Sequence, residues 1–188
     1  MSPRPKKPND IRKERGDSPE TRTFRIERLL PGPIERIWAY LTESEKRRKW
    51  LGAGPMDLRV GGRVELQFNF SELTNEKTPS GKEASCQVSG RVTQCDPPRL
   101  LSFTWGEGSD ASEVTFELTQ GRAKSVRLVI THRRLGDLGK MISVASGWHT
   151  HLDILADCLS GRNPRRFWAT KALMEEHYGK RFASKGSL

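Results

Sequence analysis

Strict alternation of apolar and polar residues runs through five segments in the centre of the chain. A period of two places the apolar side chains on one face of a β-strand and the polar ones on the other. Such segments, joined by short turns, predict an antiparallel sheet with one solvated face and one apolar face that must be covered. The alternating apolar positions are Val64, Leu66, Phe68 and Phe70; Cys86, Val88, Gly90 and Val92; Leu101, Phe103 and Trp105; Val114, Phe116 and Leu118; and Val126, Leu128 and Ile130.

The segment Asp137–Leu159 has the right pattern to cover that face. Its large apolar residues recur at steps of four and three, which predicts an amphipathic helix of about six turns. Gly161 then supplies a stop signal. The residues of the stripe are Met141, Ala145, Trp148, Leu152, Leu155 and Leu159. The sequence therefore predicts an α+β fold in which a curved antiparallel sheet of about six strands packs around one long C-terminal helix.

The segments before the central sheet predict a further strand and two short helices. Apolar residues alternate over residues 24–30, and a helical stripe follows over residues 34–41. The pattern Thr42-x-x-Glu45 is a candidate capping box that would open a second short helix through Lys49. The first strand completes the predicted set of six.

The two ends of the chain differ from the middle. Residues 1–21 contain four prolines and no apolar periodicity, which predicts a disordered basic tail. Residues 22–160 form the predicted domain, and residues 161–188 carry seven basic and two acidic side chains. In that last part Asn163-Pro164 is a candidate helix start and Gly179 a candidate end, so we expect an extra basic helix and tail.

Composition and cysteine usage favour a soluble cytoplasmic protein. The 188 residues are 34% hydrophobic, with no apolar run long enough to span a membrane and no apolar stretch typical of a secretory signal near the N-terminus. Three cysteines do not make a disulfide framework. We expect no cofactor and no metal, because His149-x-His151 on a helix would point its rings apart and Cys86 and Cys95 have no CxxC partner. Cys86 and Cys158 are interpreted as small buried hydrophobes.

Several short phrases, in their order along the chain, resemble bacterial members of the activator of heat-shock protein 90 ATPase family. These are Asp57-Leu58-Arg59-Val60-Gly61-Gly62-Arg63, Gly90-Arg91-Val92, Asp96-Pro97-Pro98-Arg99-Leu100, Phe103-Thr104-Trp105, Val114-Thr115-Phe116-Glu117-Leu118 and Gly147-Trp148. The family belongs to the START/Bet v 1-like (SRPBCC) superfamily, whose helix-grip fold typically holds a cavity between sheet and long helix. The resemblance implies a module that binds a lipid-like, apolar or aromatic molecule there.

Eight residues are candidates for lining such a cavity: Trp38, Phe68, Trp105, Phe116, His132, Met141, Trp148 and His151. His132 continues the inward parity of its strand, and His151 borders the apolar helix face, so either could orient a ligand by hydrogen bonding. The alternative is a closed core filled by the aromatic rings, with both histidines satisfied inside the protein.

Catalysis has weaker support from the sequence. Glu65, Glu113 and Glu117 fall on the outward parity, so the inward face offers no paired carboxylates. The two histidines, Arg28 and Tyr40 are the remaining candidates, which leaves a cyclase-like or hydratase-like enzyme as a third hypothesis. No catalytic residues are assigned.

Other partners are also considered. The resemblance implies a co-chaperone-type interaction module, acting in Hsp90 ATPase regulation or stress response, with a chaperone or another acidic protein as partner. Two basic clusters beside aromatic residues, Lys46–Trp50 and Arg165–Trp168, could in principle bind nucleic acid. The nearly neutral middle of the chain makes nucleic acid an improbable partner, and solvated helix faces are the simpler interpretation.

Overall fold

The computed structural model describes residues 22–74 and 76–184, so the tail predicted for residues 1–21 lies outside the described residues. The elements follow the predicted order. They are β1 (Phe24–Pro31), α1 (Ile34–Thr42), α2 (Ser44–Arg47), β2 (Arg63–Asn69), α3 (Phe70–Leu73), β3 (Ser85–Asp96), β4 (Leu100–Trp105), β5 (Ser112–Gln120), β6 (Ser125–Arg133), α4 (Leu138–Leu159) and α5 (Phe167–Ala183).

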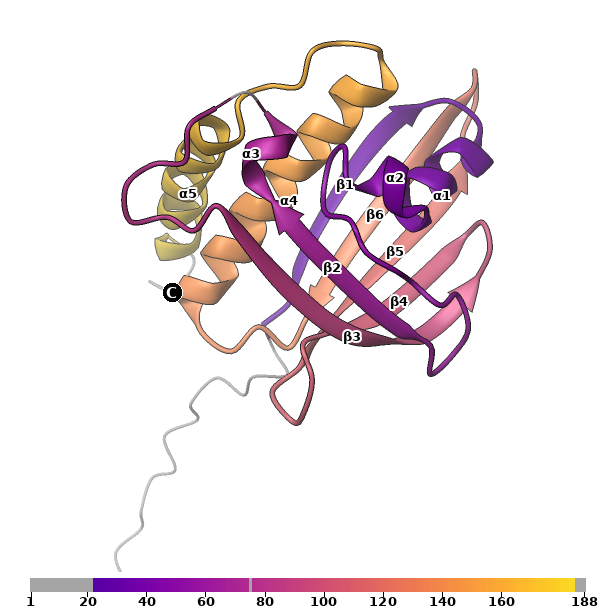
Figure 1. Ribbon diagram of the computed structural model, residues 1–188, viewed down its shortest axis with the longest axis horizontal. Coiled ribbons are helices and arrows are strands. Elements are labelled where there is room, and N and C mark those ends of the chain that lie inside the picture. Colours follow the sequence, from indigo (N-terminus) through magenta and orange to yellow (C-terminus); the bar gives the residue numbers. More distant parts are fainter. Residues whose placement is uncertain (1–21, 75, 185–188) are drawn as a thin grey trace, which may run out of the picture.

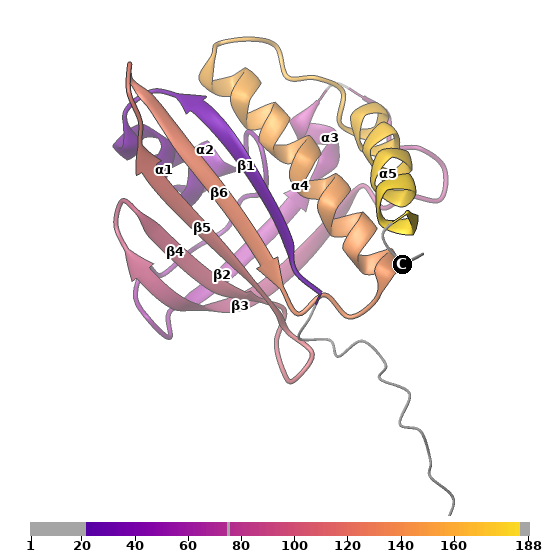
Figure 2. The same ribbon diagram turned by 180° about the vertical axis from the view of Figure 1, so that it is seen from behind.

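Six strands form one antiparallel sheet in the order β1-β6-β5-β4-β3-β2. The sheet curves, and α4 crosses its concave side diagonally, with α1 and α2 near one end of the sheet (Figure 1). The view from behind shows β1 and β6 running beside α4, while α5 lies on the far side of that helix from the sheet (Figure 2). The predicted α+β helix-grip fold is confirmed.

The core forms where the apolar face of the sheet meets α4. Leu101, Phe103 and Ile130 on the strands and Leu152 and Leu155 on the helix are buried to within 1%. Burying side chains of this size stabilises the fold by about 1.5–3 kcal/mol each before entropy costs. The alternating residues of the strands and the helical stripe of α4 therefore form the two sides of one buried interface.

Local end signals were less reliable than periodicity. The predicted capping box is wrong: α2 begins at Ser44, and the Thr42 hydroxyl donates back to the Trp38 carbonyl oxygen at 2.8 Å. Glu45 instead forms an ion pair with Arg48. An i−4 carbonyl is an alternative acceptor for a threonine hydroxyl at a helix end.

The boundaries predicted for α5 and β2 are also wrong. α5 begins at Phe167 rather than at Asn163-Pro164, and it continues through Gly179 to Ala183. β2 ends at Asn69, and Phe70 opens the short helix α3 instead of extending the strand. A one-turn helix there redirects the chain toward α5.

A distant loop completes the start of α5. The Phe167 amide donates to the Thr74 hydroxyl at 3.3 Å, and the Trp168 amide donates to a Glu76 carboxylate oxygen at 2.8 Å. The first amides of a helix have no acceptor within the helix, so these two side chains act as its cap. α5 is thereby joined to the segment after α3 as well as to α4.

Arg47 departs from the predicted solvated basic cluster, because its side chain is 1% exposed. Its guanidinium donates to the backbone carbonyls of Gly52, Leu41, Thr42 and Gly54. Burial lowers its pKa to about 10, which still leaves it charged at neutral pH. The backbone carbonyl dipoles stabilise the buried charge, and the guanidinium in turn holds the turn after α2 in place.

Among the described residues, no helix combines the length and apolar character needed to cross a lipid bilayer.

Candidate functional site

A pocket of about 560 Å³ lies between the β2–β3 side of the sheet, α3, α4 and α5. Its walls are mostly apolar and aromatic. Of the eight residues predicted to line a cavity, five contribute to this wall: Phe68, Trp105, His132, Trp148 and His151. They come from the strands β2, β4 and β6, which alternation predicted, and from α4, which the helical spacing predicted.

Three predicted residues lie elsewhere. Phe116 is 3% exposed and packs in the core, with its ring centroid 5.6 Å from that of Trp148. Trp38 and Met141 are half-buried against the core and do not line the pocket. All three residues lie on the face of their strand or helix that the sequence pattern predicts to be buried. The pattern does not show how far along the strand or helix the pocket extends.

The prediction missed the wall contributed by α3 and α5. Phe70, Phe167, Trp168 and Lys171 line the pocket, and the Phe70 and Phe167 rings stack with centroids 4.8 Å apart. The adjacent aromatic pair at 167–168 was the available signal, since two large apolar residues at the start of a basic helix need a surface to cover. α5 thus supplies part of the same pocket that the sheet and α4 enclose.

Gly147 gives the pocket some of its room. It lies in the middle of α4 and lines the pocket, and a Cβ built there would meet no atom within 4 Å. Glycine inside a helix costs about 1 kcal/mol relative to alanine. The absence of a side chain leaves open space next to Trp148.

His132 is fully engaged within the protein. The Trp148 indole donates to His132 Nδ1 at 3.0 Å, so the ring proton is on Nε2, which donates to the Ser112 hydroxyl at 2.8 Å. The side chain is 1% exposed, and burial lowers its pKa to about 3. His132 is therefore a neutral group that fixes the orientation of the Trp148 indole in the pocket wall.

His151 is held by one nitrogen only. Its Nδ1 lies 2.6 Å from the Trp50 carbonyl oxygen, and a carbonyl can only accept, so Nδ1 carries the proton. The imidazole is 6% exposed, and burial lowers its pKa to about 4. Nε2 makes no hydrogen bond within the part of the chain that the structure describes.

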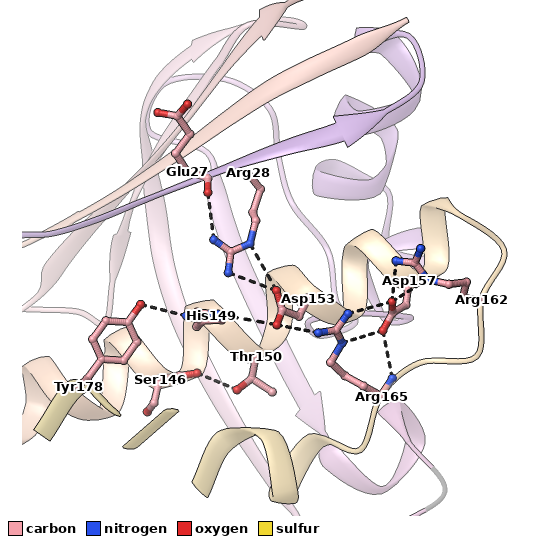
Figure 3. A network of polar contacts seen from close by, with 10 residues as sticks. All are labelled: Glu27, Arg28, Ser146, His149, Thr150, Asp153, Asp157, Arg162, Arg165 and Tyr178. Carbon is pink, nitrogen blue, oxygen red and sulfur yellow. Dashed lines mark hydrogen bonds and ion pairs between the residues drawn. The ribbon is translucent and has the colours of Figure 1, made fainter. Parts of the chain in front are cut away.

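The opposite side of α4 carries a saturated polar network (Figure 3). Asp157, 4% exposed, accepts from Arg162 and Arg165 at 2.8–3.1 Å. Asp153 accepts from Arg165 at 2.9 Å and from Arg28 of β1 at 3.2 Å. The hydrogen bonds from Arg165 and Arg162 lower the pKa of Asp157 to about 2. These carboxylates are occupied by guanidinium groups and fix the loop before α5.

The remaining groups considered for catalysis lie away from the pocket. Arg28 pairs with Asp153, and Glu65 and Glu113 pair with Arg63 and Arg134. Arg28, Tyr40 and all three glutamates are outside the pocket wall. Within the described residues, no group of three or more histidine, cysteine or acidic side chains is arranged to hold a metal ion.

The interpretation of Cys86 as a buried hydrophobe is wrong, because the residue is exposed on β3, where it borders the pocket. Cys158 is only half-buried, and its thiol donates to the Lys49 carbonyl oxygen at 3.6 Å.

The aromatic members of the two basic clusters are unavailable for stacking on bases. Trp50 is fully buried, and Phe167 and Trp168 are 1% and 9% exposed. Arg165 is bound to Asp153 and Asp157. Stacking platforms for single-stranded nucleic acid need open aromatic faces beside free cations. Neither cluster has this arrangement.

Comparison with known proteins agrees with this architecture. The protein encoded by gene BPP1335 of Bordetella parapertussis, known from a solution structure, is 43% identical, with a TM-score of 0.74 over 89% of this chain and 88% of the other. CalU16 from Micromonospora echinospora is 23% identical, with a TM-score of 0.63 over 84% of this chain and 86% of the other. DynU16, from the dynemicin biosynthetic locus, is 19% identical, with a TM-score of 0.57 over 77% and 49%.

At 23% and 19% identity, CalU16 and DynU16 show a shared fold alone. No curated protein matches the sequence. The family model for activator of Hsp90 ATPase homolog 1-like proteins matches residues 31–160, which confirms the resemblance drawn from the short phrases. The chain belongs to the activator of Hsp90 ATPase homolog 1-like family.

Proposed function

We propose that this protein binds a small apolar or aromatic molecule in the pocket between the sheet, α4 and α5. The observation that carries the proposal is the aromatic-walled space of about 560 Å³, kept open next to Trp148 by a glycine in mid-helix. Pockets of about 300–1,000 Å³ with apolar walls and a few polar groups are typical of small-molecule sites. Transfer of the ligand's apolar surface from water would drive binding, at roughly 25 cal/mol per Å² before binding costs.

In this proposal α5 is a working part of the binding domain and not an appendage. Phe167 and Trp168 are buried against Phe70 and His151, and their amides are capped by the loop after α3. Without α5, the pocket would lose one aromatic wall.

A pair of glycine variants tests the proposal. Gly147→Leu fills the pocket, whereas Gly179→Leu adds the same side chain to α5 at a position that also has no atom within 4 Å and does not line the pocket. Both changes replace a helical glycine, so both gain helix propensity. Ligand-detected NMR with an apolar and aromatic fragment library should show binders for wild type and Gly179→Leu and loss of the same binders for Gly147→Leu. An unchanged binding profile in Gly147→Leu, or no binders to wild type, would refute the proposal.

Family membership favours a second candidate, a co-chaperone-type interaction with an acidic partner. The last turn of α5 carries Lys180 and Arg181, and Leu173 on the same helix is 63% exposed. An ATPase assay of a bacterial Hsp90-type chaperone with micromolar protein tests it, with a Leu173→Asp variant as the control. Stimulation that the variant loses supports this candidate, and unchanged chaperone turnover counts against it.

A further inference from the structure

The two pocket histidines differ in how many nitrogens the protein itself occupies. His132 accepts from Trp148 and donates to Ser112, so both ring nitrogens are used. His151 uses Nδ1 on the Trp50 carbonyl oxygen and leaves Nε2 with no partner among the described residues. Nε2 is not fully enclosed by protein atoms, so it is open to the pocket space that His151 lines.

The tautomer of His151 is fixed by a rigid acceptor. The Trp50 indole donates to the Tyr40 carbonyl oxygen at 2.8 Å, and the Trp50 amide donates to the Arg47 carbonyl oxygen at 3.1 Å. Arg47 holds the following turn through the Gly52 and Gly54 carbonyls. Because this carbonyl is held in place, Nδ1 keeps its proton, and Nε2 presents a lone pair.

Within the described residues no donor forms a hydrogen bond to that lone pair, although the Lys171 ammonium is near enough to lower the pKa of His151. Its ring centroid lies 5.2 Å from that of Phe167, 6.0 Å from Phe68 and 6.5 Å from Phe70. A ligand that fills the pocket and offers this acceptor no donor would bury it unpaired, which costs about 1–3 kcal/mol. Burial holds the pKa of His151 near 4, so the ring is neutral at pH 7 and accepts rather than donates at Nε2.

The charged residues of the pocket wall do not favour an ionic ligand. Lys171 is paired with Glu175 one turn along α5. Lys82 and Glu83 are exposed neighbours of opposite charge. Their charges offset one another. Trp168 Nε1 is also unpartnered among the described residues, but it is fully enclosed, so the unpartnered atom that the pocket space reaches is the neutral acceptor Nε2 of His151.

We propose that the pocket selects ligands that combine an apolar or aromatic body with a hydroxyl or N–H donor, and that His151 Nε2 accepts the hydrogen bond from that donor. His151 is then the specificity-determining residue. This inference rests on the proposed binding function and adds a chemical requirement to it.

A matched pair of probes tests the requirement: 2-naphthol, which carries a donor, and 2-methoxynaphthalene, which has the same ring system and none. A neutral hydrogen bond contributes a net of about 0.5–1.5 kcal/mol, so wild type should bind 2-naphthol roughly two- to twelvefold more tightly. The His151→Phe variant should lose this preference, because its ring has no acceptor nitrogen. Titrations followed by tryptophan fluorescence give the affinities, and Trp105 and Trp148 in the pocket wall supply the signal.

Nitrogen-15 NMR of histidine-labelled wild type provides a measurement that needs no variant. 2-Naphthol should move the His151 Nε2 resonance toward the hydrogen-bonded range, and 2-methoxynaphthalene should not. Both nitrogens of His132 serve as the internal control, since the protein already occupies them. Equal affinities with an unmoved Nε2 resonance would overturn this inference and leave the binding function standing. Failure of both probes to bind would count against the binding function itself.

Discussion

The two sides of α4 are built on opposite rules. On the side shown in Figure 3, Asp153 and Asp157 are saturated by arginines from β1 and from the loop before α5. On the pocket side, Gly147 faces open space and His151 has an unused nitrogen. A buried polar group left unpaired is costly, whereas a saturated one is inert. One side of this helix therefore fixes the structure, and the other keeps open space and an unused acceptor, which is the basis of the proposed binding function.

The largest expected effect is the loss of stability in acid, to which the two pocket histidines contribute and Asp157 does not. The folded pKa values of His132 and His151 are about 3 and about 4, below the ordinary 6.5, so only the unfolded chain takes up these protons as the pH falls. Stability is then lost progressively below pH 6.5, by several kcal/mol at pH 4, at about 1.4 kcal/mol per pKa unit. Asp157 stays ionised until about pH 2, so its network persists over this range.

Urea denaturation at pH 7, 6, 5 and 4 measures this loss. The His132→Gln variant keeps an acceptor for the Trp148 indole but cannot titrate, so its stability should depend less steeply on pH. An identical slope in the variant would contradict the assignment.

The scaffold that holds His151 should show the next largest effect. Arg47→Met removes a buried guanidinium that serves backbone carbonyls of α1 and of the turn after α2, and we expect a loss of about 3 kcal/mol. Arg48→Met removes an exposed neighbour paired with Glu45 and Glu72 and should destabilise the protein far less, because exposed ion pairs contribute little. Chemical denaturation midpoints give both values. Equal effects would mean that burial of Arg47 carries no energetic weight.

On the saturated side, Asp157→Ala should lower the free energy of unfolding by about 2 kcal/mol, because Arg162 and Arg165 lose their shared acceptor. Glu176→Ala removes a carboxylate that is 64% exposed in its pair with Lys180 and should barely change stability, because exposed ion pairs contribute little. Neither change should alter binding of an aromatic probe in the pocket. Loss of probe binding in a still-folded Asp157→Ala protein would break the proposed division between the two sides.

The smallest expected effects come from substituting two tryptophans of the pocket wall, one whose indole N–H is hydrogen-bonded and one whose indole N–H is not. Trp148→Phe removes the donor to His132 and should cost about 1–2 kcal/mol. Trp168 Nε1 is the sole fully buried side-chain polar atom in the described residues with no partner. Trp168→Phe should therefore change stability by about 0.5 kcal/mol or less, since lost contact area is offset by removal of an unpaired donor. Denaturation curves of the two variants measure both losses of stability. A larger loss for Trp168→Phe than for Trp148→Phe would contradict this prediction.

Periodicity was enough to predict the sheet and α4, because burial on one face imposes a period on the sequence. It also placed the candidate residues on the inward faces, whereas the expectation of a cavity there came from the family resemblance. Three features had no such signal. Arg47 is buried against backbone carbonyls, which look alike in every sequence. The start of α5 is capped from residues 74 and 76, about ninety positions away. Phe70 has the parity of a strand residue, yet the chain turns there into α3.

The cap on α5 has a kinetic consequence. Because the Phe167 and Trp168 amides are anchored to Thr74 and Glu76, any separation of the start of α5 from these two residues breaks both hydrogen bonds. If the proposed ligand enters between α5 and these residues, both hydrogen bonds break together. The hydrogen–deuterium exchange rate of the Phe167 and Trp168 amides would then report how often this opening occurs. A tightly bound ligand would lower that rate.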